Sequence, residues 1–143
     1  MGKEKDKVNA PFKKACEKYL DPLHFQRMEV WTDRGVPDIN LCHRGIEAWV
    51  ECKWVDGGAR AWQFSHPMTG PQLAFQKARE AAGGLAFTLA RRGDTFKLWS
   101  SRDVVEVKER GWEASGCLVS LEGRPWDWPS LLQHLFRLPE GIS

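Results

Sequence analysis

Apolar side chains recur every three or four positions in two stretches of the chain, and this spacing predicts amphipathic helices. The first helix is predicted over 9–20, where Asn9 can cap it, and the second over 71–82, where a glycine pair follows. Two further helices are predicted from their opening residues, one over 100–110 and one that begins at 127–129. The pattern therefore places helices near both ends of the chain and in its middle.

Shorter apolar runs separate these helices, and they predict β-strands. The second and third runs flank Arg44-Gly45, and two strands around a short glycine-containing connection predict a hairpin. The runs cover residues 24–31, 37–43, 46–55, 85–90, 95–99 and 117–121. Strands and helices in this order describe an α/β protein, with one central mixed β-sheet flanked by helices.

The length and composition fit one domain. The chain has 143 residues, of which 42% are hydrophobic and 28% charged. Residues 1–8 alternate lysine with acidic residues and offer little to bury, so we expect a disordered tail followed by a single domain over 9–143. An apolar run of about 18 residues and a signal-peptide core are both absent from the sequence, which predicts a cytoplasmic protein that does not span a membrane.

The net charge and the tryptophan content exclude few classes of function. A net charge of +2 excludes little, and eight tryptophans against one tyrosine suit cores, interfaces and base-stacking surfaces alike. The four cysteines are scattered and lack the spacing of zinc ligands, so we expect reduced thiols and no structural zinc.

The most informative side chains lie in the predicted hairpin. Glu51 and Lys53 are two positions apart on one strand, so they leave the same face. If the turn is centred on Arg44-Gly45, Asp38 lies directly opposite Glu51. Two carboxylates that face each other repel unless a cation lies between them. The pattern therefore predicts a cation site.

The same pattern predicts the hydrolysis of phosphodiesters. Hard oxygen ligands suit Mg²⁺, which takes one or two carboxylates and keeps bound water. Lys53 beside the metal can orient or deprotonate the attacking water, or stabilise negative charge on the phosphate. Glu-x-Lys on a strand is by itself typical of a solvated face. The facing Asp38, with Gly35 placing the turn before it, makes the combination specific.

These residues resemble a known family. Gly35-Val36-Pro37-Asp38 followed by Glu51-Cys52-Lys53 is similar to the PD-(D/E)xK nuclease superfamily, whose members share a restriction-endonuclease-like core. The phrases RGVPDINL and WVECKW are most similar to its VRR-NUC and phage Holliday-junction-resolvase-like members. The resemblance continues through Gln72 and residues 81–87, and it covers about residues 34–90.

The resemblance implies a role for each matching residue. The catalytic residues would be Asp38, Glu51, Lys53 and Gln72, with Lys53 as the catalytic lysine and Gln72 positioning it or the water. Asp38, Glu51 and the backbone carbonyl of Cys52 would ligate Mg²⁺, for which Mn²⁺ can substitute. Many members also carry an acidic residue on the first helix, and Glu17 is the candidate here. The segment between Lys53 and Gln72 is longer than usual in the family, which indicates a loop specialised for substrate.

Candidate contacts to DNA lie in that loop and on the first helix. Arg60, Trp62 and His66 belong to the loop over 56–71, where aromatic and cationic side chains can stack on bases or brace a backbone. Alternatively, Trp62 packs the loop down as a lid. Lys13 and Lys14 are predicted to contact phosphates, although a solvated helix face is the commoner explanation for such lysines.

Together these features predict a metal-dependent endodeoxyribonuclease, selective for branched or junction DNA and encoded by a phage. The alternative is a nuclease-like module that binds DNA without cutting it. A glycosidase with two carboxylates would leave Lys53 without a role. We expect a homodimer, since junction cleavage involves two strands related by a two-fold axis, and no small-molecule cofactor. The last helix, with Leu131, Leu135 and Phe136, would form the dimer surface or pack on its own sheet.

Overall fold

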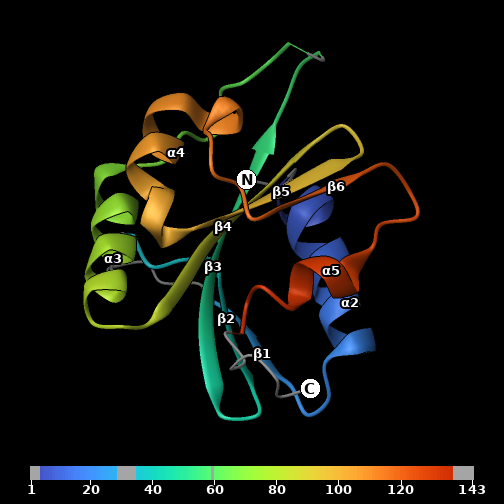
Figure 1. The fold of residues 1–143 in the computed structure, drawn as a ribbon. Coiled ribbons are helices and arrows are strands. Elements are labelled where there is room, and N and C mark those ends of the chain that lie inside the picture. The colour runs from blue at the N-terminus through green and yellow to red at the C-terminus, as the bar shows by residue number, and fades with distance from the viewer. Residues whose placement is uncertain (1–3, 29–34, 59, 137–143) are drawn as a thin grey trace.

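A six-stranded β-sheet forms the centre of the computed structural model, which describes residues 4–28, 35–58 and 60–136 (Figure 1). The strands follow chain order: β1 (His24–Arg27), β2 (Ile39–His43), β3 (Ile46–Val55), β4 (Leu85–Arg92), β5 (Thr95–Ser100) and β6 (Val119–Glu122). β3 and β4 run parallel, and the other four neighbouring pairs are antiparallel. The predicted fold, a single α/β domain around a mixed sheet, is confirmed.

Helices cover both faces of this sheet. They are η1 (Lys5–Asn9), α2 (Ala10–Tyr19), α3 (Gly70–Ala81), η2 (Ser101–Asp103), α4 (Val104–Arg110), η3 (Gly111–Glu113) and α5 (Trp128–Leu132). α2 and α5 lie together on one face, and α3 and α4 on the other (Figure 1). α3 also supplies the crossover that the parallel pair β3–β4 requires. None of the described helices combines the length and hydropathy that a membrane span requires.

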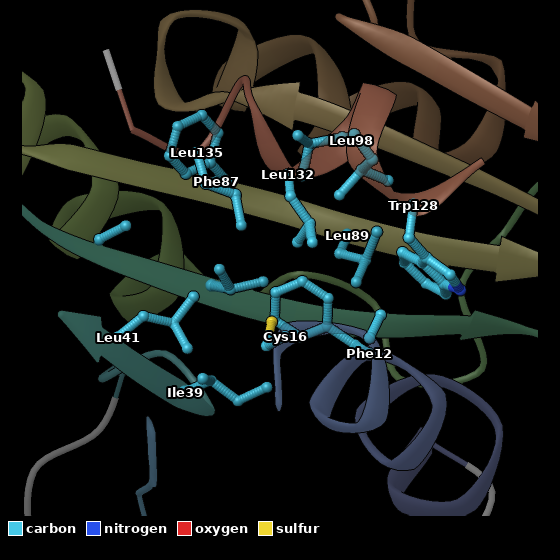
Figure 2. Close-up of a cluster of buried hydrophobic side chains, with 14 of the residues drawn as sticks. Phe12, Cys16, Ile39, Leu41, Phe87, Leu89, Leu98, Trp128, Leu132 and Leu135 are labelled. Atoms are coloured by element: carbon cyan, nitrogen blue, oxygen red, sulfur yellow. The ribbon is translucent and has the colours of Figure 1, made fainter. Parts of the chain in front are cut away.

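The alternation of side chains along β3 decides which residues enter the main core. Ala48, Val50 and Cys52 point toward α2 and α5, where they join a buried cluster with Phe12 and Leu131. Figure 2 shows this cluster, with Phe12 and Cys16 of α2 beside Leu89 of β4. Because successive side chains on a strand alternate between faces, Glu51 and Lys53 leave β3 on the α3 side. The predicted parity of β3 is therefore confirmed.

The predicted hairpin register is also confirmed. His43 pairs with Ile46, and the ladder continues to the pair Ile39 and Val50. Arg44 and Gly45 both have positive φ, at 51° and 82°, as a two-residue hairpin turn requires. Asp38 comes one position beyond the ladder, at the level of Glu51.

The N-terminal segment differs from the predicted disordered tail. Residues 5–9 form a turn of π-helix that runs into α2, and Val8 is fully buried. Val8 precedes Phe12 by four positions, so it extends the apolar face of α2 by one turn. Asn9 accordingly lies inside a helix and makes no capping hydrogen bond. The tail prediction is wrong for this part, and residues 1–3 lie outside the described residues.

Several boundaries are shorter than predicted. β1 ends at Arg27, and residues 29–31 of the predicted strand lie outside the described residues. α5 has five residues, yet Leu131, Leu135 and Phe136 are almost completely buried against the chain's own sheet. These side chains are therefore core residues and do not form a dimer surface. All four cysteines are free thiols, as predicted.

Candidate active site

The four residues predicted to be catalytic line one pocket. Its volume is about 190 Å³, and it lies between the start of α3 and the end of the β2–β3 hairpin farthest from the turn, where Asp38 and Glu51 are. The residues that line it are Glu4, Lys5, Asn9, Arg27, Asp38, Glu51, Cys52, Lys53, His66 and Gln72. The fold thus brings Asp38, Glu51, Lys53 and Gln72 together from three separate segments.

Asp38 is held by the backbone of the strand that carries its partners. One of its carboxylate oxygens, Oδ2, accepts a hydrogen bond of 2.8 Å from the Cys52 N–H. Asp38 lies one position beyond the β2–β3 ladder, so its side chain, and not its backbone, makes this contact to β3. The contact places the Asp38 carboxylate between the positions of Glu51 and Lys53.

Glu51 is a carboxylate in an unfavourable place. It is 3% exposed, and its Oε1 is buried without a hydrogen-bond partner among the described residues. Burial raises the pKa of its carboxyl well above the ordinary value, and the negative charge of Asp38 raises it further. Lys53 opposes the shift in the pKa, but its influence ranks below both. A carboxylate that is costly to ionise and has a free oxygen is well suited to meet a cation.

Lys53 is buried, and three acceptors orient its ammonium group. The side chain is 2% exposed, and Nζ donates to the His66 carbonyl at 2.9 Å and to Gln72 Oε1 at 3.0 Å. Its distance to Glu51 Oε2 is 3.5 Å. A buried lysine needs such partners to keep its charge. The arrangement fixes one positive charge beside the two carboxylates.

Gln72 connects this charge pattern to the start of α3. Its side-chain amide donates from Nε2 to Glu51 Oε2 at 3.2 Å, while Oε1 accepts from Lys53. Oε1 also accepts from the Thr69 N–H, and the Thr69 hydroxyl accepts from the Gln72 N–H, which together form a capping box. The spacing Thr69-x-x-Gln72 is a helix-start signal in the sequence. It places the start of the helix one residue before the predicted start at Pro71.

The acidic residue that the N-terminal helices bring to the pocket is Glu4, and the predicted Glu17 does not line it. Glu17 lies on the exposed side of α2 and borders a different hollow. Glu4 lines the pocket, and its Oε1 lies 2.9 Å from His66 Nδ1. The prediction missed Glu4 because residues 1–8 were assigned to a tail. The helical spacing of Val8 and Phe12 was the signal that would have placed it.

The loop between β3 and α3 contributes one of its predicted contacts to the pocket. Phe64 and Met68 are buried and anchor the loop, whereas Trp62 is 41% exposed and does not line the pocket. The Trp62 carbonyl accepts from the Trp112 N–H, which ties this part of the loop to η3. Arg60 is exposed and also lies outside the pocket lining. His66 alone among these three candidates reaches the pocket.

Positive charge surrounds the acidic centre. Lys5 and Arg27 line the pocket, and both are exposed. Lys13 and Lys14, the predicted DNA contacts on the first helix, are exposed on α2 and border neighbouring hollows, not the pocket itself. The pocket is thus an acidic pit with cationic side chains at its rim.

The donor set fits a hard divalent cation that retains water. Across residues 4–28, 35–58 and 60–136, no three His, Cys, Asp or Glu side chains converge into a ready ligand group. Mg²⁺ does not need such a group, because one or two carboxylates and water suffice. The unpartnered Oε1 of Glu51, next to the Asp38 carboxylate, offers the oxygen atoms that this ion prefers.

Comparisons with known proteins add no relative. A scan of the chain against protein-family models finds no match, and no curated protein matches it. Membership of the PD-(D/E)xK superfamily therefore stays a prediction from the motif residues.

Proposed function

We propose that this protein is a metal-dependent endodeoxyribonuclease that hydrolyses DNA phosphodiester bonds and prefers branched or junction DNA. The observation that carries the proposal is the buried Glu51 carboxylate beside Asp38, with the Lys53 ammonium at 3.5 Å. Burying the Glu51 carboxylate beside the half-buried Asp38 costs free energy, which a bound cation would recover. Because this placement of the carboxylates destabilises the metal-free fold, metal binding explains it better than a role in stability.

Each residue then has a chemical task. Asp38 and Glu51 would hold Mg²⁺ or Mn²⁺, with the Cys52 backbone carbonyl added from the family resemblance. The ion, when bound, supplies an activated water and neutralises charge on the phosphate. Lys53 holds a positive charge where negative charge develops on the phosphate oxygens, and Gln72 and the His66 carbonyl keep its ammonium in place.

The rim cations explain how DNA would reach this pit. Lys5 and Arg27 lie at the pocket and can contact backbone phosphates on either side of the scissile bond. A two-fold dimer remains part of the proposal because a junction presents two equivalent strands. Its interface would use surfaces other than the buried residues of the C-terminal segment.

A substrate panel tests the proposal. With Mg²⁺ or Mn²⁺ the purified protein should nick junction or flap DNA faster than single-stranded or duplex DNA, and it should cut none of them in EDTA. Lys53→Met preserves the buried chain but removes its charge, and we expect cleavage to fall by about 10²–10³-fold. Lys77→Met, at an exposed position on α3, is the matched control and should cleave normally. Tight DNA binding without nicking under every condition would favour the binding module instead.

A second prediction separates the structural and the positioning roles of Gln72. Thr69→Ala and Gln72→Ala both break the capping box, which should lower the free energy of unfolding by about 1 kcal/mol, and Gln72→Ala should lower it further because buried Lys53 and Glu51 lose a partner. Only Gln72→Ala also removes the contacts to Lys53 and Glu51, so it alone should slow cleavage, by at least about tenfold. Urea denaturation and single-turnover cleavage measure the two effects. Equal cleavage rates in the two variants would contradict the positioning role.

A further inference from the structure

A row of surface hollows, which we call the path, leads from the candidate active site along the N-terminal helices. The active-site pocket shares Lys5, Asn9 and Arg27 with a hollow of about 250 Å³. That hollow shares Ala10 and Lys13 with a larger one of about 580 Å³. The hollows therefore follow one another along α2, and each borders the next at the residues that they share.

The path ends in what we call the α2 groove, which has a volume of about 590 Å³. One wall is α2, with Pro11, Lys14, Ala15, Lys18 and Tyr19, and the other is Arg124, Pro125, Trp126 and Trp128. It shares Pro11, Lys14, Arg124 and Trp126 with the hollow before it. Among the described residues, those that line the α2 groove include no acidic side chain.

The aromatic side chains of the α2 groove are held in place. Trp126 Nε1 donates to the Asp94 carbonyl at 2.7 Å, and the Arg124 guanidinium lies 4.6 Å from the centre of its ring. On the opposite wall Tyr19 is 45% exposed, an unusual state for a large aromatic side chain, and Lys18 Nζ lies 5.1 Å from its ring. Each wall thus presents an aromatic ring next to a cation, and the Arg124 guanidinium also lies 3.5 Å from Asp94 Oδ1.

Charge along the path favours an anionic ligand. The hollow before the α2 groove is lined by the acidic Asp6 and Glu17, but also by the cationic Lys7, Lys13, Lys14, Arg91 and Arg124. The α2 groove adds Lys18. Cations in a row beside exposed aromatic rings are typical of surfaces that bind single-stranded nucleic acid, where bases stack and phosphates pair with lysines.

We propose that the α2 groove binds a single-stranded segment of the nucleic-acid substrate, whose backbone runs along the path to the active site. An unpaired segment is required because the faces of paired bases are already stacked on one another and cannot reach Tyr19. The inference rests on the proposed nuclease function and specifies its substrate as DNA with a single-stranded arm. Lys13 and Lys14 then contact that arm, and the active-site pocket receives the scissile phosphate.

Binding of a fluorescein-labelled oligothymidylate in EDTA, followed by anisotropy, tests the groove without cleavage. Tyr19→Ala should weaken binding by at least about fivefold, whereas Tyr19→Phe keeps the ring and should bind normally. Lys14→Ala with Lys18→Ala should also weaken binding and lower the slope of log K against log salt by about 0.7 for each lost phosphate contact. The matched control is Lys77→Ala with Lys108→Ala, which removes two exposed lysines on the opposite side of the sheet.

The outcomes separate this proposal from the nuclease activity. Groove-dependent binding by a protein that cuts no DNA would overturn the proposed function and support the groove. Oligonucleotide binding that Tyr19→Ala and the double lysine variant leave unchanged would overturn the groove proposal, whether or not DNA is cut. Binding of a labelled acidic peptide in place of the oligonucleotide would also overturn it, in favour of a protein partner. In a cleaving protein, the groove variants should slow cleavage of armed duplex more than cleavage of blunt duplex.

Discussion

Glu51→Gln should stabilise the metal-free protein and at the same time abolish DNA cleavage. The substitution removes a buried charge that burial and Asp38 both disfavour, while the amide keeps the shape of the side chain. We expect the free energy of unfolding to rise by about 0.5–2 kcal/mol, the range of single stabilising substitutions. Cleavage should fall by at least about a hundredfold, because the site loses a carboxylate that faces the proposed cation.

The raised pKa of Glu51 also predicts how the stability of the protein changes with pH. The pKa of Glu51 is higher in the folded protein than in the unfolded chain, so the folded state binds the proton more tightly. Between the unfolded and the folded pKa, stability therefore falls as pH rises, and it is regained as pH is lowered through the folded pKa. Glu51→Gln should lose this slope above the ordinary glutamate pKa.

Thermal or urea denaturation across pH measures both effects. Glu47→Gln is the matched control, because Glu47 lies on the same strand but is exposed, and its variant should keep the wild-type slope. Added Mg²⁺ at a hundred times Kd should raise the free energy of unfolding of the wild type by about 2.7 kcal/mol, and with it the melting temperature, and should leave Glu51→Gln almost unchanged. A Glu51→Gln protein that is less stable than the wild type, or one that still cuts DNA, contradicts the assignment.

Gly35→Ala should destabilise the fold strongly, because the added methyl group would meet the backbone at the start of α3. Gly35 has φ of +90°, and a Cβ there would lie 2.3 Å from the Pro71 carbonyl oxygen and 2.9 Å from the Gln72 nitrogen. Both atoms belong to the backbone, so the start of α3 must shift. Backbone strain and overpacking each cost about 1–3 kcal/mol, and together we expect about 3 kcal/mol or more.

Gly35→Ala should also lower the rate of DNA cleavage. A displaced start of α3 moves Gln72 away from Lys53 and Glu51, so the remaining folded protein should also cut more slowly. Gly45→Ala is the matched control: Gly45 has φ of +82°, but a Cβ there would meet nothing within 4 Å. It should cost only the strain, about 1–2 kcal/mol. Equal losses of stability in the two variants would show that the close approach to Pro71 is unimportant.

Local geometry explains why the centre of the site was predictable from the sequence. The two-residue period of a strand places Glu51 and Lys53 on one face, and a hairpin turn at Arg44 and Gly45 determines the register for every pair behind it. The observed ladder follows that register to Ile39 and Val50, and Asp38 comes next. These relations need no knowledge of the rest of the chain.

Long-range packing explains what the prediction missed. Whether Glu4 or Glu17 approaches the pocket depends on how the N-terminal helices rotate on the sheet, and the burial of Val8 and Phe12 determines that rotation. Trp62 does not line the pocket although its loop follows Lys53, because Phe64 and Met68 anchor the loop, and its contact to DNA stays a prediction. Neither outcome follows from local spacing.

By itself, the sequence determined the α/β class, the hairpin register and the relative positions of Asp38, Glu51 and Lys53, because each follows from interactions between near neighbours along one or two strands. Only the tertiary structure decided that Gln72 bridges Lys53 and Glu51, that Glu4 reaches the same pocket, and that Tyr19 and Trp126 line one groove. The reason is physical: these contacts join segments far apart in the chain, and the burial of a shared apolar core, not local geometry, sets their distances.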